Sequence, residues 1–322
     1  FGKNSVQSID SSMMFFSTRS DLKPKKKGSL LDYTQNLMDS APSYGGAKWK
    51  HAGNAIDQVS KVFNDERLSS DAYTMSGIAY ENLKLYDVAI QNHKKALKIN
   101  EHNYQAYNNL AIAYTFLDKV ETSINLLKKA IEIKPHFYEG VYRLGQLQML
   151  KKQFSEGWKN YESRWLCIDY KQKKLETFKP KLKKFTEGLK VLVWPEQGVG
   201  DQIIYGSMFK EISQKTSNLI VQCDKRLISI FQSIHSSVTF YDKETKISEA
   251  DYDVHIPMAD IGAHFRKSEE DFKNAKFPFI SGNSQITKNI IKKYKRSKNS
   301  LIGISWTSSK ATLSSEKSIF LL

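Results

Sequence analysis

The sequence predicts an α domain followed by an α/β domain: a run of helical repeats, then a parallel sheet with helices. Three observations lead to this fold class. They are a 34-residue period from Ser70, an alternation of strand-like and helix-like stretches from Lys190, and a composition in which 40% of the 322 residues are hydrophobic and 12% aromatic. A chain of this length exceeds one ordinary domain, so two folded units with tails are expected.

The first 47 residues show no sustained period. Ser, Lys, Gly and Pro are scattered through residues 1–47, which is typical of a poorly ordered segment, and we assign no function to it. From Ser70 onward, aromatic and small residues recur at a spacing of 34. The recurring positions are Tyr73, Gly77, Tyr80, Ala89 and Ala96 in the first unit, and Tyr107, Ala111, Tyr114, Ser123 and Ala130 in the second.

A third unit continues this register, with Gly145 and Gly157 at the two small positions. Ala55 lies 34 residues before Ala89, which indicates a partly preserved fourth unit upstream. The pattern resembles the tetratricopeptide repeat, in which small residues let the two helices of a hairpin approach closely. We expect such a domain over residues 48–167, with a concave surface that binds a protein or peptide partner. The alternative is that so short an array only packs against the next domain.

The stretch "FSEGWKNYESRW" carries an apolar stripe at helical spacing, formed by Phe154, Trp158, Tyr161 and Trp165. Such a stripe is usually core, so we expect it to form the seam between the repeats and the second domain. A Lys-rich linker, residues 168–187, follows it.

Residues 188–298 alternate between strand and helix patterns. "KVLVW", "NLIVQC", "VTFY" and "YDVHIPM" are strand-like, whereas "KRLISIFQSI" and the stretch from Asp201 to Ser213 are helical in pattern. This alternation predicts a parallel sheet with helices on both faces. Ligands of such sheets bind beyond the carboxyl ends of the strands.

The loop after the first predicted strand, in "WPEQGVGDQIIYG", contains two closely spaced glycines, Gly198 and Gly200. The phosphate loop GxxxxGK[ST] is excluded because no Lys-Ser or Lys-Thr follows at the required spacing. A dinucleotide fingerprint is also disfavoured, because Ile203 stands where the third glycine belongs. Asp201 has two interpretations, a helix N-cap or a general base. A helix N-terminus favours the charged carboxylate, which weakens it as a base.

The order of these features resembles the bacterial repeat-containing glycosyltransferases related to O-linked N-acetylglucosamine transferase and to heptosyltransferases. The resemblance covers about residues 70–322, and its most specific part is "EQGVGDQIIYGSMF" after the repeats. It implies a GT-B fold whose first, Rossmann-like half lies on the acceptor side. It also implies that Asp201 deprotonates an acceptor hydroxyl. The residues placed beside the substrate are Glu196, Gln197, Gly198 and Gly200.

The stretch "LIGISW" resembles the first strand of the donor-binding half, so Ser305 and Trp306 are expected to begin the nucleotide-sugar site. Residues 299–322 are then the start of a truncated donor half, and this chain alone is not expected to transfer sugar. The resemblance implies a nucleotide-sugar donor, a glycan or protein acceptor, and no cofactor or metal. The rival interpretation is a non-catalytic repeat scaffold for protein interactions.

The formal charge of +15 does not select a partner, because the lysines are spread over predicted helix faces. We therefore expect no specific nucleic-acid partner, and salt-dependent binding to generic DNA would argue for a basic nucleic-acid protein instead. Two isolated cysteines suggest neither a disulfide framework nor a zinc site, which fits a cytoplasmic protein. No apolar stretch approaches the ~20 residues of a membrane helix.

Overall fold

The computed structural model divides into two compact units, Phe1–Ala275 and Lys276–Leu322. The residues it describes are 66–167, 174–275, 279–280 and 284–294.

The described part of the second unit contains one helix, α14 (Ser284–Tyr294). Several sequence-based expectations fall elsewhere. The segment 1–47, the upstream repeat around Ala55, and the predicted donor-side residues Ser305 and Trp306 lie outside the described residues.

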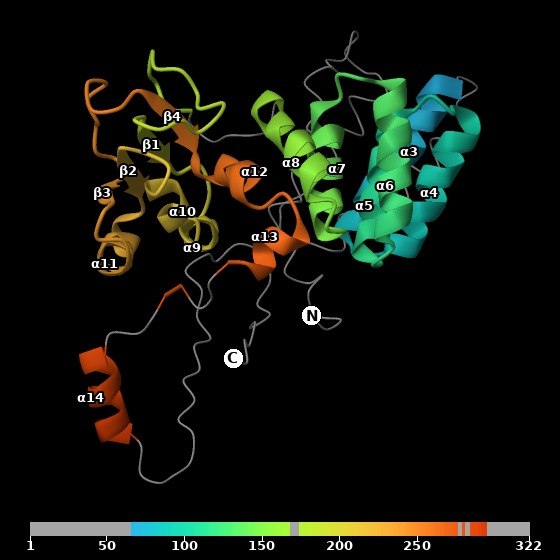
Figure 1. Cartoon of the computed structure of the whole chain (residues 1–322). Helices are drawn as coiled ribbons and strands as arrows, with labels where there is room; N and C mark the ends of the chain where they lie inside the picture. Colours follow the sequence, from blue (N-terminus) through green and yellow to red (C-terminus); the bar gives the residue numbers. More distant parts are fainter. Residues whose placement is uncertain (1–65, 168–173, 276–278, 281–283, 295–322) are drawn as a thin grey trace. The chain divides into compact units, whose positions relative to one another are not determined.

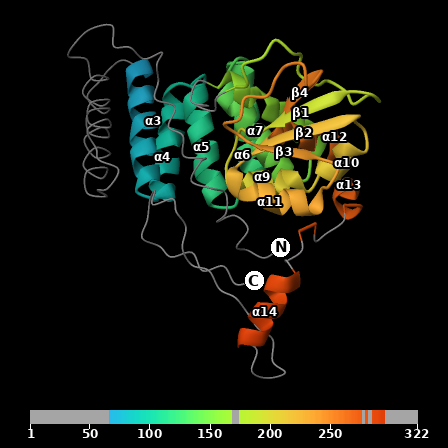
Figure 2. The ribbon, with the colours of Figure 1, turned by 90° about the vertical axis from the view of Figure 1, so that its left-hand side faces the viewer.

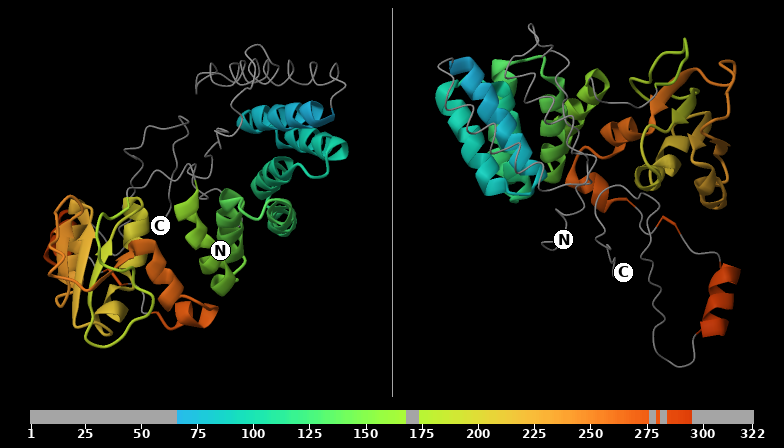
Figure 3. Two further views of the ribbon diagram at one scale, coloured as in Figure 1. Left: turned by 90° about the horizontal axis from the view of Figure 1, so that it is seen from above. Right: turned by 180° about the vertical axis from the view of Figure 1, so that it is seen from behind.

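Three helical hairpins form the first part of the described chain (Figure 1). They pair α3 (Glu66–Asn82) with α4 (Tyr86–Ile99), α5 (Tyr104–Phe116) with α6 (Val120–Ile133), and α7 (Tyr138–Leu150) with α8 (Phe154–Tyr161). Each helix packs against the next one along the chain, so the hairpins stack in sequence order (Figure 3). This is the arrangement that the 34-residue period predicts.

The small residues of the repeat register lie where two helices of a hairpin touch. A Cβ on Gly145 would lie 2.6 Å from the backbone nitrogen of Tyr161 and 2.8 Å from the carbonyl oxygen of Gly157. In the second hairpin, Ser123 Oγ donates to the carbonyl oxygen of Ala111 at 2.8 Å. The small side chains therefore set the distance between the paired helices.

The three hairpin turns repeat one backbone conformation. Lys84, Asp118 and Lys152, spaced 34 residues apart, have positive φ angles of 59°, 58° and 62°. The residue after each of them closes the turn by donating its backbone N–H to a carbonyl five residues earlier. These bonds are Leu85 to Tyr80 at 2.9 Å, Lys119 to Tyr114 at 2.9 Å, and Gln153 to Gln148 at 2.8 Å. Because the left-handed residue is not glycine in any repeat, the usual sequence signal for this helix ending is missing.

The second part is built on a four-stranded parallel sheet in the order β3-β2-β1-β4. The strands are β1 (Lys190–Trp194), β2 (Asn218–Cys223), β3 (Thr239–Asp242) and β4 (Val254–Pro257). The central strand β1 pairs with β2 and β4, and Val193 lies between Val221 and Ile256. The carboxyl end of β1 is thus in the middle of the sheet, where the glycine loop begins.

One face of the sheet is covered by α9 (Val199–Gly206), α10 (Phe209–Ser213) and α11 (Lys225–Ile234) (Figure 2). The rings of Phe209, Phe231 and Phe240 pack together there, with centroids 5.3–5.9 Å apart. The sequence predicted one helix from Asp201 to Ser213, but the helix is interrupted at Ser207–Met208 and α10 starts anew.

The opposite face differs from the expectation of helices on both sides. Leu192, Ile220 and Tyr252 form a cluster there, covered by Leu175 and Ile247. Leu175 lies in the segment before β1 and Ile247 in the connection between β3 and β4, and neither residue belongs to a helix. Part of the predicted linker also joins the sheet, since Lys181 forms a parallel bridge to His255.

The third hairpin and the sheet domain meet through the aromatic stripe. Trp158 donates its indole N–H to the carbonyl oxygen of Arg266 at 2.8 Å, and a Cβ on Gly262 would lie 2.2 Å from the Trp158 ring. Phe154 packs on Phe272 with ring centroids 4.6 Å apart. The prediction that this stripe forms a seam is confirmed.

The seam on the sheet side is made of short helices. They are η3 (Met258–Ile261), α12 (Gly262–Phe265) and α13 (Glu269–Lys273), while η2 (Glu162–Leu166) continues α8 on the repeat side. Within the described residues, Cys167 and Cys223 are both reduced and form no disulfide. Among the helices of the described residues, none combines the length and apolar character needed to cross a lipid bilayer.

Candidate functional site

The glycine loop joins the carboxyl end of β1 to α9 and leaves open space beside it. Gly198 and Gly200 are both exposed. A Cβ on Gly200 would meet no atom within 4 Å, and one on Gly198 would meet only Asp201 Oδ2, at 3.4 Å. Neither glycine adopts a positive φ, so the local backbone does not require glycine at either position. The two glycines therefore leave the surface at the start of α9 without side chains at these positions.

Asp201 lies in the first turn of α9 and is half-exposed. Its Oδ2 accepts a hydrogen bond from the backbone N–H of Gly198 at 3.2 Å, which satisfies an N–H that the helix itself leaves unpaired. The sequence suggested Asp201 as the N-cap, but the N-cap is Gly198, and Asp201 contributes to the cap from the third position of the helix. The second proposed role, as a base, stays a prediction.

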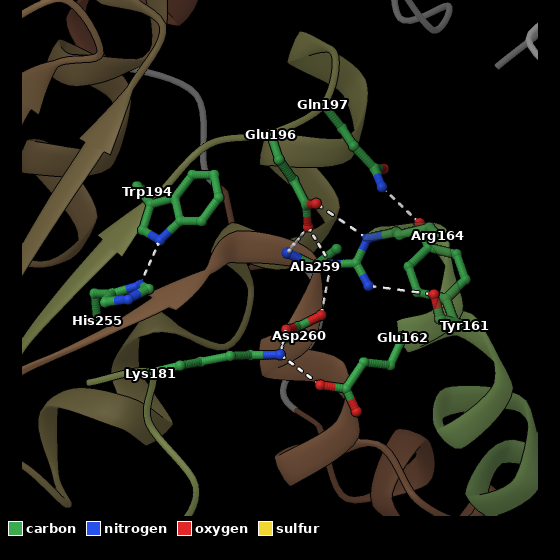
Figure 4. A network of polar contacts seen from close by, with 10 residues as sticks. All are labelled: Tyr161, Glu162, Arg164, Lys181, Trp194, Glu196, Gln197, His255, Ala259 and Asp260. Carbon is green, nitrogen blue, oxygen red and sulfur yellow. Dashed lines mark hydrogen bonds and ion pairs between the residues drawn. The ribbon is translucent and has the colours of Figure 1, made fainter. Parts of the chain in front are cut away.

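Glu196 lies next to the loop but is buried (Figure 4). Arg164 binds both of its carboxylate oxygens, through Nε at 3.0 Å and Nη2 at 2.7 Å. The backbone N–H of Ala259 adds a third bond at 3.2 Å. The Glu196 side chain thus contacts protein groups, and its position suits it to fix the loop.

Arg164 has a fully buried guanidinium that also binds Asp260, with Nη2 and Oδ1 2.5 Å apart. Its charge is further contacted by the rings of Tyr161 and Trp165, each 4.7 Å away. Burial by itself would lower the pKa of Arg164, but its hydrogen bonds to the Glu196 carboxylate and the charge of Asp260 outweigh burial and raise the pKa. Arg164 is therefore charged at every physiological pH.

The network continues from Asp260 to the surface. Lys181 Nζ lies 2.7 Å from Asp260 Oδ2 and 2.7 Å from Glu162 Oε1. These carboxylates raise the pKa of Lys181 against the lowering effect of burial. Two cations and three carboxylates alternate from the loop outward, so the buried charges are paired.

Gln197 is held by the repeat side as well. Its Nε2 donates to the hydroxyl of Tyr161 at 2.5 Å, and its carbonyl oxygen accepts from Gln202 Nε2 at 3.1 Å. Gln202 Oε1 in turn accepts the backbone N–H of Asp224 at 2.8 Å, which joins the loop to the end of β2. The Gln197 backbone and side chain are therefore both held in place by other groups of the protein.

The structure brings Glu196, Gln197, Gly198, Gly200 and Asp201 together at one edge of the sheet. In the described part of the chain, no group of His, Cys, Asp and Glu side chains has the geometry of a metal site.

The sequence interpretation missed Arg164, Lys181 and Asp260 as members of this site. Arg164 offered one signal, because it is a charged residue directly beside the aromatic stripe. Its partners Glu196 and Asp260 lie 32 and 96 residues away in the sequence, so the pairing itself was not readable.

Comparisons with known proteins identify the repeats. Residues 70–103 and 104–137 each match the tetratricopeptide repeat family. No curated protein matches this chain.

Several solved repeat proteins resemble part of the chain. The crystal structure of MamA is 22% identical, with a TM-score of 0.33, over 36% of this chain and 67% of that one. The first tetratricopeptide domain of Spaghetti (RPAP3), bound to an HSP90 peptide, is 22% identical, with a TM-score of 0.29, and the match covers 29% of this chain and 75% of that one. The Sgt2 repeat domain from Aspergillus fumigatus is 26% identical, with a TM-score of 0.28, and the match covers 29% of this chain and 62% of that one. The first part of the chain, with its two matched units and stacked hairpins, carries tetratricopeptide repeats.

Proposed function

We propose that this chain carries the acceptor-side part of a repeat-containing glycosyltransferase. The observation that carries the proposal is the position of Asp201. It is a half-exposed carboxylate at the carboxyl edge of a parallel sheet, beside a surface that Gly200 leaves bare. Crevices at this edge are where such sheets bind ligands. The resemblance of "EQGVGDQIIYGSMF" to the corresponding loop of these enzymes supports the same assignment.

In the proposed reaction an acceptor hydroxyl attacks the anomeric carbon of a nucleotide sugar. The new bond joins the acceptor oxygen to that carbon, the bond to the diphosphate breaks, and the nucleoside diphosphate leaves. Asp201 takes the hydroxyl proton. The N-terminus of α9 favours the charged form of Asp201 before the reaction, so the carboxylate is ready to accept a proton but is a mild base. Gln197 and Glu196 hold the loop, and Gly198 and Gly200 make room for the acceptor.

The donor side of the proposal concerns residues beyond those described. For the nucleotide sugar, the sequence resemblance proposes Ser305 and Trp306. Helix N-termini and cationic side chains are suited to neutralise the leaving diphosphate.

A second candidate function is a protein-interaction scaffold, favoured by the two tetratricopeptide repeats at residues 70–137. Stacked repeats present extended surfaces that bind partners. In this alternative the sheet domain supports the repeats and Asp201 only caps α9.

The deciding experiment is a transfer assay on the protein expressed from its complete reading frame. The purified protein is incubated with a panel of nucleotide sugars and with candidate glycan and protein acceptors, and products are identified by mass spectrometry. Formation of a glycosylated product with release of nucleoside diphosphate supports the enzyme. Stable capture of a partner by the repeats, with neither transfer nor nucleotide-sugar binding, supports the scaffold and contradicts the first proposal.

A further inference from the structure

The hydroxyl of Tyr161 lies where the repeats and the glycine loop meet. Tyr161 ends α8, is 7% exposed, and receives the amide N–H of Gln197 at 2.5 Å (Figure 4). Two more tyrosines interact with this hydroxyl. The ring of Tyr142, from α7 in the repeats, lies 5.2 Å from the Tyr161 ring, and Tyr205 comes from α9, one turn after Asp201.

The Tyr161 phenol has a small number of hydrogen bonds to share among these neighbours. A tyrosine hydroxyl has one O–H to donate and two lone pairs that accept. The Gln197 amide occupies one lone pair, which leaves the O–H and the second lone pair for the neighbouring tyrosine hydroxyls. A shift of any one partner therefore leaves a buried polar atom of another without its bond, which is costly in an apolar surrounding.

The same segment holds the neighbouring loop residue. Tyr161 and Arg164 are three residues apart on one helical face, and they bind Gln197 and Glu196 respectively. Two consecutive residues of the loop are thus fixed by two side chains of the repeat segment. A movement of this segment relative to the sheet cannot leave the loop unchanged.

We propose that Tyr161 is a positioning residue that couples the repeats to the glycine loop through the chain Tyr142–Tyr161–Gln197. This proposal rests on the proposed function, because it describes regulation of the same loop. Tyr142 belongs to α7, so its contact with Tyr161 depends on the position of that helix. A partner that displaces α7 or engages Tyr142 weakens the Tyr161–Gln197 bond and alters the loop that presents Asp201.

Amide hydrogen exchange, measured by mass spectrometry on this chain, tests the coupling without any assay of sugar transfer. Tyr161→Phe keeps the ring and removes the hydroxyl. We expect exchange in residues 197–205 to become about five- to tenfold faster, the effect of losing one or two hydrogen bonds. Amides of β2 and β3 should be unchanged. The decisive variant is Tyr142→Phe, which does not touch the loop and should still speed exchange there at least ~2-fold through the same bonds.

Tyr138→Phe is the matched control. Tyr138 lies on the same helix, and its hydroxyl shares an exposed hydrogen bond with His136, at 3.3 Å. Loop exchange in this variant should match the wild type. Equal loop exchange in Tyr142→Phe and Tyr138→Phe would overturn the coupling, and so would acceleration spread evenly over the whole chain. An absence of sugar transfer would refute the proposed function and leave this result standing.

Discussion

Replacing Arg164 with leucine removes the cation that binds both carboxylate oxygens of Glu196 inside the protein. The backbone N–H of Ala259 would still bind Glu196, and Lys181 would still bind Asp260. The two Arg164–Glu196 bonds, at 3.0 and 2.7 Å, and the bond to Asp260, at 2.5 Å, would be lost together. Arg164→Leu therefore takes the bound cation away from a carboxylate that is fully buried.

The cost follows from this desolvation. Breaking a buried ion pair by removing one partner destabilises a protein by about 3–5 kcal/mol. We expect the upper part of this range, because Arg164 and Glu196 both have fully buried side chains. At ~4 kcal/mol the unfolding equilibrium shifts by nearly three orders of magnitude.

Urea unfolding followed by circular dichroism measures this change. Adding Glu196→Gln to Arg164→Leu should recover a large part of the loss, since the double variant no longer buries a lone charge. Arg226→Leu is a control, because Arg226 forms an exposed ion pair with Asp224 and should have little effect. A decrease of less than ~1 kcal/mol in the free energy of unfolding of Arg164→Leu would refute the reasoning, because breaking a buried, bidentate ion pair costs more than that.

Two further predictions concern helix packing and pH. Gly145→Ala should destabilise the protein by about 1–3 kcal/mol in urea unfolding, because its Cβ would lie 2.6 Å from a backbone nitrogen and 2.8 Å from a carbonyl oxygen of α8. Gly200→Ala, with no atom within 4 Å, should have almost no effect, and equal losses in both variants would contradict this packing. His255 accepts the indole N–H of Trp194 at 3.0 Å, and burial together with the charge of Lys181 lowers its pKa below 6.5. Protonation of His255 is therefore less favourable in the folded than in the unfolded protein. The stability that His255 contributes is complete above pH 6.5 and should fall as the pH drops toward the lowered pKa. Melting curves should show a weaker pH dependence in His255→Gln.

The repeats were predictable because their signal is local. Small residues recur at a fixed spacing, and each hairpin needs only its own two helices to place Gly145 against α8. The strands "KVLVW" and "NLIVQC" were equally readable, because a buried parallel strand is apolar along its whole length. The break between α9 and α10 was not predicted, since the apolar period continues across Ser207–Met208.

The candidate site was predictable only in part. The loop runs without interruption from Glu196 to Asp201, and its position directly after an apolar strand pattern predicts a loop there. The side chains that hold the loop come from elsewhere. Arg164 belongs to the repeat segment, Asp260 follows β4, and Lys181 belongs to a segment whose Lys-rich composition indicated only a linker. Their meeting depends on tertiary packing at the seam, which no sequence period encodes.

The central claim is that Asp201 takes a proton rather than only capping α9, and one pair of variants separates these roles. Asp271 occupies the same position in α13, where its carboxylate accepts the N–H of Ser268 at 2.8 Å. Asp201→Asn and Asp271→Asn therefore alter caps of the same kind, and Asp271 accepts the N–H of Lys267 as well. The measurement is the initial rate of sugar transfer by the protein from the complete reading frame. The account predicts a loss of about 10²–10⁴-fold in Asp201→Asn alone, with similar small losses of stability in both variants. Undiminished transfer by Asp201→Asn would contradict it.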